Sequence, residues 1–99
     1  MYFRSVKIYS ESEILCECNE FPNDCNFLNI RNPDIDITVA YDNDRTRKKS
    51  KLFDKTFYGN IIVFPQCDDL KEDEEFNHFF NFIEINIKFF ESKRNKIEE

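Results

Sequence analysis

This 99-residue sequence contains very little glycine and histidine, and no tryptophan. Its single glycine excludes a glycine-rich phosphate-binding loop, and its single histidine, His78, excludes any mechanism that needs two histidines. The sequence has no apolar run of about 18 residues, so no membrane-spanning helix is predicted. The N-terminus alternates apolar and polar residues and lacks the apolar core of a secretory signal, which predicts a cytoplasmic protein.

The composition indicates a folded, acidic protein. The 20 acidic residues outnumber the 14 basic ones, which gives a net charge of −6. Direct nucleic-acid binding is therefore disfavoured, because phosphates repel a net anion. With 40% hydrophobic residues and 12 phenylalanines, the chain can form a core, and we expect one domain over residues 1–99. The abundance of Phe, Ile, Lys and Asn is typical of AT-rich genes, including those of phages.

Alternation of apolar and polar residues predicts strands in the first two thirds of the chain. Apolar residues at 35, 37, 39 and 41 share one side of such a strand, and mostly polar residues share the other. The polar segment 10–13 predicts a hairpin loop, and 43–51 predicts a longer loop. Residues 61–64 are apolar on both sides and predict a central strand. The predicted extended segments are 2–9, 14–18, 27–30, 35–41, 52–58 and 61–64.

A long helix is predicted from about residue 69 to residue 99, because this segment contains no glycine or proline. Asp69 and Glu72 have the spacing of a capping box. A helix of this length would measure roughly 45 Å, whereas an eight-residue strand measures about 26 Å. We therefore expect its charged end, 92–99, to fray or project. The predicted fold is α+β, an antiparallel sheet of four to five strands with one long C-terminal helix packed on one face.

The predicted helix has two apolar stripes. The wider stripe should pack on the sheet and comprises Phe76, Phe79, Phe80, Ile83, Ile87 and Phe90. The second stripe lies nearly opposite and comprises Phe82, Ile85 and Phe89. It is either covered by another part of the chain or forms the surface of a homodimer or partner complex, because monomers rarely expose large apolar patches.

The four cysteines, Cys16, Cys18, Cys25 and Cys67, are expected to be reduced thiols in the cytoplasm. They could serve as zinc ligands, together with His78, but the usual Cys-x2-4-Cys turn is absent. Small buried side chains are the favoured interpretation. No catalytic residue, metal or cofactor is predicted, and we do not expect an enzyme.

Charge is distributed unevenly along the sequence. The segment 45–55 has a net charge of +5, and the rest of the chain has −11. This basic segment is interpreted as a solvated loop, a phosphate contact or a contact for an acidic partner. Its basic residues are Arg45, Arg47, Lys48, Lys49, Lys51 and Lys55.

An acidic run precedes and begins the predicted helix, with six acids among the eight residues 68–75. Carboxylates there complement the helix dipole, but six exceed what the dipole requires. Together with acids near the 35–41 strand, they predict a negative surface that attracts basic proteins. The predicted partner-binding residues are Asp68, Asp69, Glu72, Asp73, Glu75, Asp34 and Asp36.

These features favour a small acidic protein inhibitor that blocks a basic partner, such as a nuclease toxin or another nucleic-acid enzyme. Short, acidic, cytoplasmic chains without catalytic motifs are typical of bacterial immunity proteins, antitoxins and phage-encoded inhibitors. Two alternatives stay open. One is a homodimeric structural or regulatory protein, and the other is a small zinc-binding module.

Overall fold

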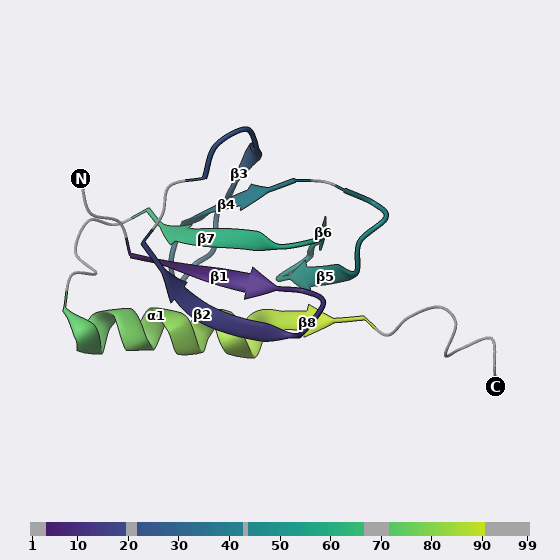
Figure 1. Cartoon of the computed structure of the whole chain (residues 1–99). Helices are drawn as coiled ribbons and strands as arrows, with labels where there is room; N and C mark the ends of the chain where they lie inside the picture. Colours follow the sequence, from purple (N-terminus) through teal and green to yellow (C-terminus); the bar gives the residue numbers. More distant parts are fainter. Residues whose placement is uncertain (1–3, 20–21, 43, 67–71, 91–99) are drawn as a thin grey trace.

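The computed structural model describes residues 4–19, 22–42, 44–66 and 72–90, and within these ranges it contains two antiparallel sheets and one helix (Figure 1). The larger sheet has the strand order β2-β1-β7-β4-β3, and the smaller has the order β6-β5-β8. The predicted α+β class is confirmed. The elements are β1 (Ser5–Tyr9), β2 (Ile14–Cys18), β3 (Asn26–Ile30), β4 (Ile37–Tyr41), β5 (Lys49–Leu52), β6 (Lys55–Tyr58), β7 (Ile61–Pro65), α1 (Asp73–Asn86) and β8 (Ile87–Phe89).

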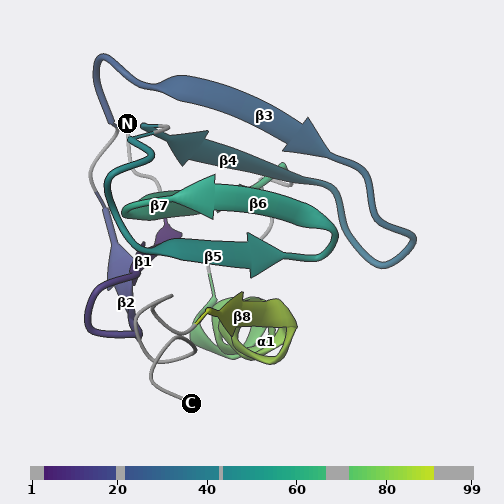
Figure 2. The same ribbon diagram turned by 90° about the vertical axis from the view of Figure 1, so that its right-hand side faces the viewer.

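The strands of the larger sheet follow the predicted alternation. β2, β3 and β7 match the predicted strands to within one residue, and β1 and β4 overlap theirs. The predicted hairpin between the first two strands is confirmed, because Tyr9 pairs with Ile14 across a four-residue loop. In Figure 2, β3 is the outermost strand of this sheet, and α1 lies below the sheets.

β7 is the central strand of the larger sheet, as its apolar sequence predicts. Val63 pairs with Val6 on one side and with Val39 on the other, and all three side chains are fully buried. They belong to one core with Phe76 and Ile83 of α1. The helix therefore packs through Phe76, Phe79 and Ile83 of the wider predicted stripe. Ile87 and Phe90, which were also assigned to that stripe, lie in β8 and directly after it.

The helix is much shorter than predicted, because the chain becomes extended after Asn86. Ile87 has φ −89° and ψ 138°, and β8 pairs antiparallel with β5. The Asn86 side chain donates a hydrogen bond to the Phe82 carbonyl at 2.8 Å and so satisfies one carbonyl of the last turn. Pairing with a distant strand outweighs the local helical pattern here. The predicted helix end at 92–99 lies outside the described residues.

The helix also begins later than predicted. Its N-cap residue is Glu72, which has an extended backbone and makes no capping hydrogen bond through its side chain. The predicted capping box with Asp69 as the N-cap residue is therefore wrong. Glu72 still accepts the first intrahelical hydrogen bond through its carbonyl, from the Phe76 N–H at 3.0 Å.

The segment predicted as a loop followed by one apolar run forms a hairpin instead. β5 begins at Lys49, and Leu52 pairs with Lys55 across a turn at 53–54. Phe53 adopts a positive φ of 58° in this turn, a strained conformation for a bulky residue. The Phe53 N–H donates to the Asn86 carbonyl at 3.4 Å, and its ring packs against Phe82, so tertiary contacts hold the turn.

Candidate functional site

The first turn of α1 presents a group of exposed carboxylates. Glu72 is the N-cap residue, and Asp73, Glu74 and Glu75 follow it in the first turn. Negative side chains at this position are stabilised by the helix dipole and the free N–H groups. No ion pair joins Glu72, Glu74 or Glu75 to another residue within the described ranges. These three carboxylates are therefore available to a partner.

Asp34 and Asp36 lie in the turn between β3 and β4, which short-range hydrogen bonds organise. The Asp34 N–H donates to the Asn32 side-chain oxygen at 2.9 Å, and the Asp36 carboxylate accepts from the Asn32 N–H at 3.4 Å. The Gln66 N–H donates to the Asp36 carbonyl at 3.1 Å. Because Gln66 follows β7, this turn lies at the end of the sheet where β7 finishes.

The helix begins at the same end of the sheet. Val6 pairs with Val63, so Arg4, which precedes β1, lies beside the end of β7. Arg4 Nη1 forms an ion pair with Asp73 Oδ1 at 3.0 Å. Figure 1 shows α1 starting at this end, on the left of the view. We define the acidic end as the six residues Asp34, Asp36, Glu72, Asp73, Glu74 and Glu75.

Arg4 joins the acidic end to the sheet. Its Nε and Nη2 donate to the two carboxylate oxygens of Glu17 at 2.8 and 3.2 Å, and its guanidinium lies 4.3 Å from the Phe76 ring centroid. The hydrogen bond to Glu17 raises the pKa of Arg4, although desolvation opposes the rise. The ion pair between Arg4 and Asp73 partly neutralises the charge of the Asp73 carboxylate. No sequence pattern predicted this role for Arg4.

Five of the seven predicted partner-binding residues share the acidic end: Asp34, Asp36, Glu72, Asp73 and Glu75. The other two, Asp68 and Asp69, lie outside the described residues. Glu74 was not among the predicted contacts, yet its exposed carboxylate belongs to the same helical turn.

The predicted second apolar stripe does not form a continuous helical face. Phe82 packs against Phe53, with ring centroids 5.7 Å apart, and Phe89 belongs to strand β8 and is partly buried. Ile85 alone of the three is well exposed, at 77%. The stripe is interrupted because the helix ends at Asn86. A homodimer through these three residues stays a prediction.

The three described cysteines lie on opposite edges of the larger sheet. Cys16 and Cys18 are on β2 and Cys25 precedes β3, and these strands form opposite edges of the five-stranded sheet. Four steps between strands separate them, roughly 19 Å, whereas zinc needs sulfur ligands at about 2.3 Å. One zinc ion therefore cannot be held by the β2 cysteines together with Cys25, and a zinc site that uses other ligands stays a prediction. Cys67 lies outside the described residues.

The surroundings of the three described thiols agree with their separation across the sheet. Cys16, Cys18 and Cys25 form no disulfide bond within the described residues. Burial raises the pKa of Cys25, and the carboxylates of Asp42 and Asp24 raise it further. In the described ranges, no three His, Cys, Asp or Glu side chains gather in a way that could hold a metal ion.

Two of the six bases in the segment 45–55 are neutralised by the β1–β2 loop. Lys48 forms an ion pair with Glu13, and Arg47 forms a longer one with Glu11 at 3.8 Å. The Lys48 N–H also donates to Glu11 at 3.1 Å. These contacts attach the segment to the larger sheet, and from Lys49 onward it belongs to the β5–β6 hairpin and not to a loop, although Arg45, Lys49 and Lys55 are exposed. The other four bases have no ion pair in the described part of the chain.

The comparisons with known proteins found no match to this chain, whether among protein-family models, curated proteins or solved structures. Within the residues that the structure describes, no helix has the length and apolar character needed to cross a bilayer.

Proposed function

We propose that this protein is a small inhibitor that binds a basic partner protein through its acidic end. The observation that carries the proposal is the position of the carboxylates. The first turn of α1 and the β3–β4 turn are 36 residues or more apart in sequence, yet both lie where β7 ends. Glu72, Glu74 and Glu75 are exposed and have no cationic partner among the described residues.

Electrostatics supports a basic partner. Carboxylates close together on one surface repel each other, and a cationic surface relieves this repulsion on binding. A negative surface also steers a basic protein towards it and raises the association rate constant, most strongly at low salt. The acidic end supplies both effects without a catalytic group.

The proposed partner is a nuclease toxin or another nucleic-acid enzyme. Such enzymes bind phosphates in basic clefts, and the carboxylates of the acidic end can form ion pairs with the same cationic side chains. Binding there excludes the substrate, so inhibition needs no chemistry from this chain. We propose the cytoplasm as the compartment, which is supported by the absence of a disulfide bond at Cys16, Cys18 and Cys25 within the described residues.

The test captures the partner with the tagged full-length chain from cells that encode it, and identifies it by mass spectrometry. Glu72→Lys/Glu75→Lys reverses two charges at the acidic end. Asp54→Lys/Glu84→Lys makes the same charge change at exposed positions elsewhere and serves as the matched control. We expect capture of a strongly basic nucleic-acid enzyme by the wild type and the control, and loss of capture by the acidic-end variant.

The purified partner then gives a quantitative test. We expect the wild type to inhibit its activity at a one-to-one ratio and to associate at least about tenfold faster than the acidic-end variant at low salt, with the difference shrinking as salt rises. Capture of a neutral or acidic protein, or equal capture by both variants, would show that the proposal is wrong.

A further inference from the structure

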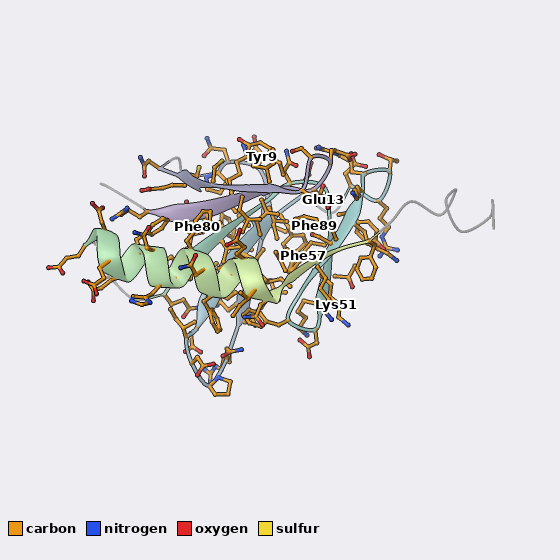
Figure 3. The ribbon with its side chains drawn as sticks, turned by 90° about the horizontal axis from the view of Figure 1, so that it is seen from below. Tyr9, Glu13, Lys51, Phe57, Phe80 and Phe89 are labelled. Atoms are coloured by element: carbon orange, nitrogen blue, oxygen red, sulfur yellow. The ribbon has the colours of Figure 1, made fainter. Side chains whose placement is uncertain are left out.

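Strand β8 creates a second charged surface, on the outer face of the smaller sheet. Lys51 of β5 lies directly opposite Lys88 of β8, and Lys49 lies opposite Tyr58 of β6. The alternate residues of these strands, including Leu52 and Phe57, are buried on the inner face. Figure 3 shows this division, with Lys51 directed outward at the edge of the molecule and Phe57 in its interior.

Aromatic rings lie among these cations. The Arg45 guanidinium lies over the Tyr58 ring, 5.5 Å from its centroid, and the Lys49 ammonium lies 5.0 Å from the centroid of Phe90. Tyr58 and Phe90 are both partly exposed. We define the basic face as the four cations and two rings that these contacts and pairings bring together: Arg45, Lys49, Lys51, Lys88, Tyr58 and Phe90.

The fold does not compensate the charge of this face. None of its four cations forms an ion pair with a carboxylate in the described part of the chain, in contrast to Arg47 and Lys48 nearby. Like charges directly opposite each other on antiparallel strands are destabilising, and Lys51 and Lys88 have this relation. An anion bound at this face would remove the repulsion.

We propose that the basic face binds single-stranded nucleic acid. The cations contact successive phosphates, and bases stack on the rings of Tyr58 and Phe90. Arg45 and Lys49, which now cover these rings, would turn to the phosphates when a base takes their place. The rings are the reason to favour a single strand, because every base has a stacking surface and a duplex conceals it.

The net negative charge of the chain does not prevent this face from binding phosphates. The acidic end lies where β7 finishes, whereas the smaller sheet lies at the other end of the molecule in Figure 1. Salt screens exposed charges beyond about 8 Å at physiological ionic strength. The basic face therefore acts on phosphates largely independently of the acidic end, so the expectation drawn from the net charge does not apply to it.

The test measures fluorescence anisotropy of a labelled oligothymidine of about 12 nucleotides with the full-length chain. We expect binding that weakens with salt, with a slope of log affinity against log salt near about −3 for four phosphate contacts. Lys49→Ala/Lys51→Ala should lower the affinity at least about tenfold and reduce the slope by about 1.4. Tyr58→Ala should lower the affinity about fivefold and leave the slope unchanged.

The matched control is Lys7→Ala/Arg31→Ala, which removes two cations from outside the basic face. We expect it to bind like the wild type. Circular dichroism and the Tm verify that each variant is folded, and Tyr58→Leu replaces Tyr58→Ala if the alanine variant is not.

Three results would overturn this proposal. One is the absence of binding at low salt, and another is an equal loss of affinity in the control and in the Lys49/Lys51 variant. The third is equal binding of a duplex of the same length, or of vesicles rich in phosphatidylserine, without dependence on Tyr58. That result would show a general polyanion surface and not a single-strand site.

Discussion

The acidic end and the basic face are both charged surfaces, but the fold supports them differently. The carboxylates of α1 lie at a helix N-terminus, where the dipole stabilises them, and Arg4 neutralises Asp73. The basic face instead places Lys51 opposite Lys88, with no carboxylate beside them in the described residues. Folding therefore accounts for part of the charge at the acidic end, whereas within the described residues no carboxylate offsets the charge of the basic face.

The largest expected effect comes from breaking the strand that creates the basic face. Ile87 is buried in β8, opposite Leu52. Ile87→Ala should lower the free energy of unfolding by about 2–4 kcal/mol, because it leaves a cavity in the core. Urea denaturation measures this loss. The NMR chemical shifts of Arg4 and Asp73 should stay unchanged in the folded variant. Changes in these shifts would mean that the acidic end and the basic face are structurally coupled.

The next effect concerns the acidic end. Arg4→Ala removes the hydrogen bonds to Glu17 and the ion pair with Asp73, and leaves both carboxylates without this cation. We expect a fall in Tm that is several times that of Arg31→Ala, which removes an exposed cation. Thermal unfolding measures the Tm of the two variants. An equal fall in Tm would show that Arg4 does not join the acidic end to the sheet.

The inner side of the smaller sheet allows a change that leaves the basic face intact. Ser50 is fully buried, and its hydroxyl has no hydrogen-bond partner among the described residues. Ser50→Ala should raise the free energy of unfolding by about 1 kcal/mol, because an unsatisfied buried hydroxyl is removed. Oligothymidine affinity should stay the same. A loss of stability in urea would indicate that the hydroxyl has a partner.

A smaller effect tests the repulsion between the two lysines directly. Lys51→Glu places a carboxylate opposite Lys88 and should stabilise the fold by roughly 0.5 kcal/mol. The same change should abolish most oligothymidine binding, so stability and binding move in opposite directions. Lys55→Glu, at the exposed end of the hairpin, is the control for stability. Destabilisation by Lys51→Glu would contradict the claim that the fold is strained here.

The smallest effect is a dependence on pH in the turn that leads to the basic face. The Thr46 hydroxyl and N–H donate to the Asp44 carboxylate at 2.6 and 3.1 Å, and they lower the pKa of Asp44. A lowered pKa stabilises the fold above the pKa of the unfolded chain, and this stabilisation is lost as pH falls through the folded pKa. NMR titration should show the pKa of Asp44 below the ordinary aspartate range, and Thr46→Ala should raise it only part of the way back, because the backbone N–H of residue 46 still donates.

Much of the larger sheet could be predicted, because its strands carry a local period of two and end at turn residues. The length of the helix could not. Ile83, Ile85, Ile87 and Phe89 also alternate with a period of two, so the segment fits a strand as well as a helix. Only pairing with β5, more than 30 residues away, decides between them.

The candidate sites could likewise be predicted only in part. Composition identified the carboxylates of the acidic end, because a run of acids is visible in the sequence. It did not identify Arg4, whose partners lie 13 and 69 residues away. Of the basic face it identified Arg45, Lys49 and Lys51 but not Lys88, which meets Lys51 only through the pairing of β8. Local patterns indicate charge, and tertiary pairing decides which charges meet.

The most direct test of the central claim is the association rate constant between this chain and its captured partner at low salt. We expect Glu72→Lys/Glu75→Lys to lower this constant at least about tenfold and Asp54→Lys/Glu84→Lys to leave it near the wild-type value. Equal rate constants for the two variants would contradict the account, because binding would then not depend on the acidic end.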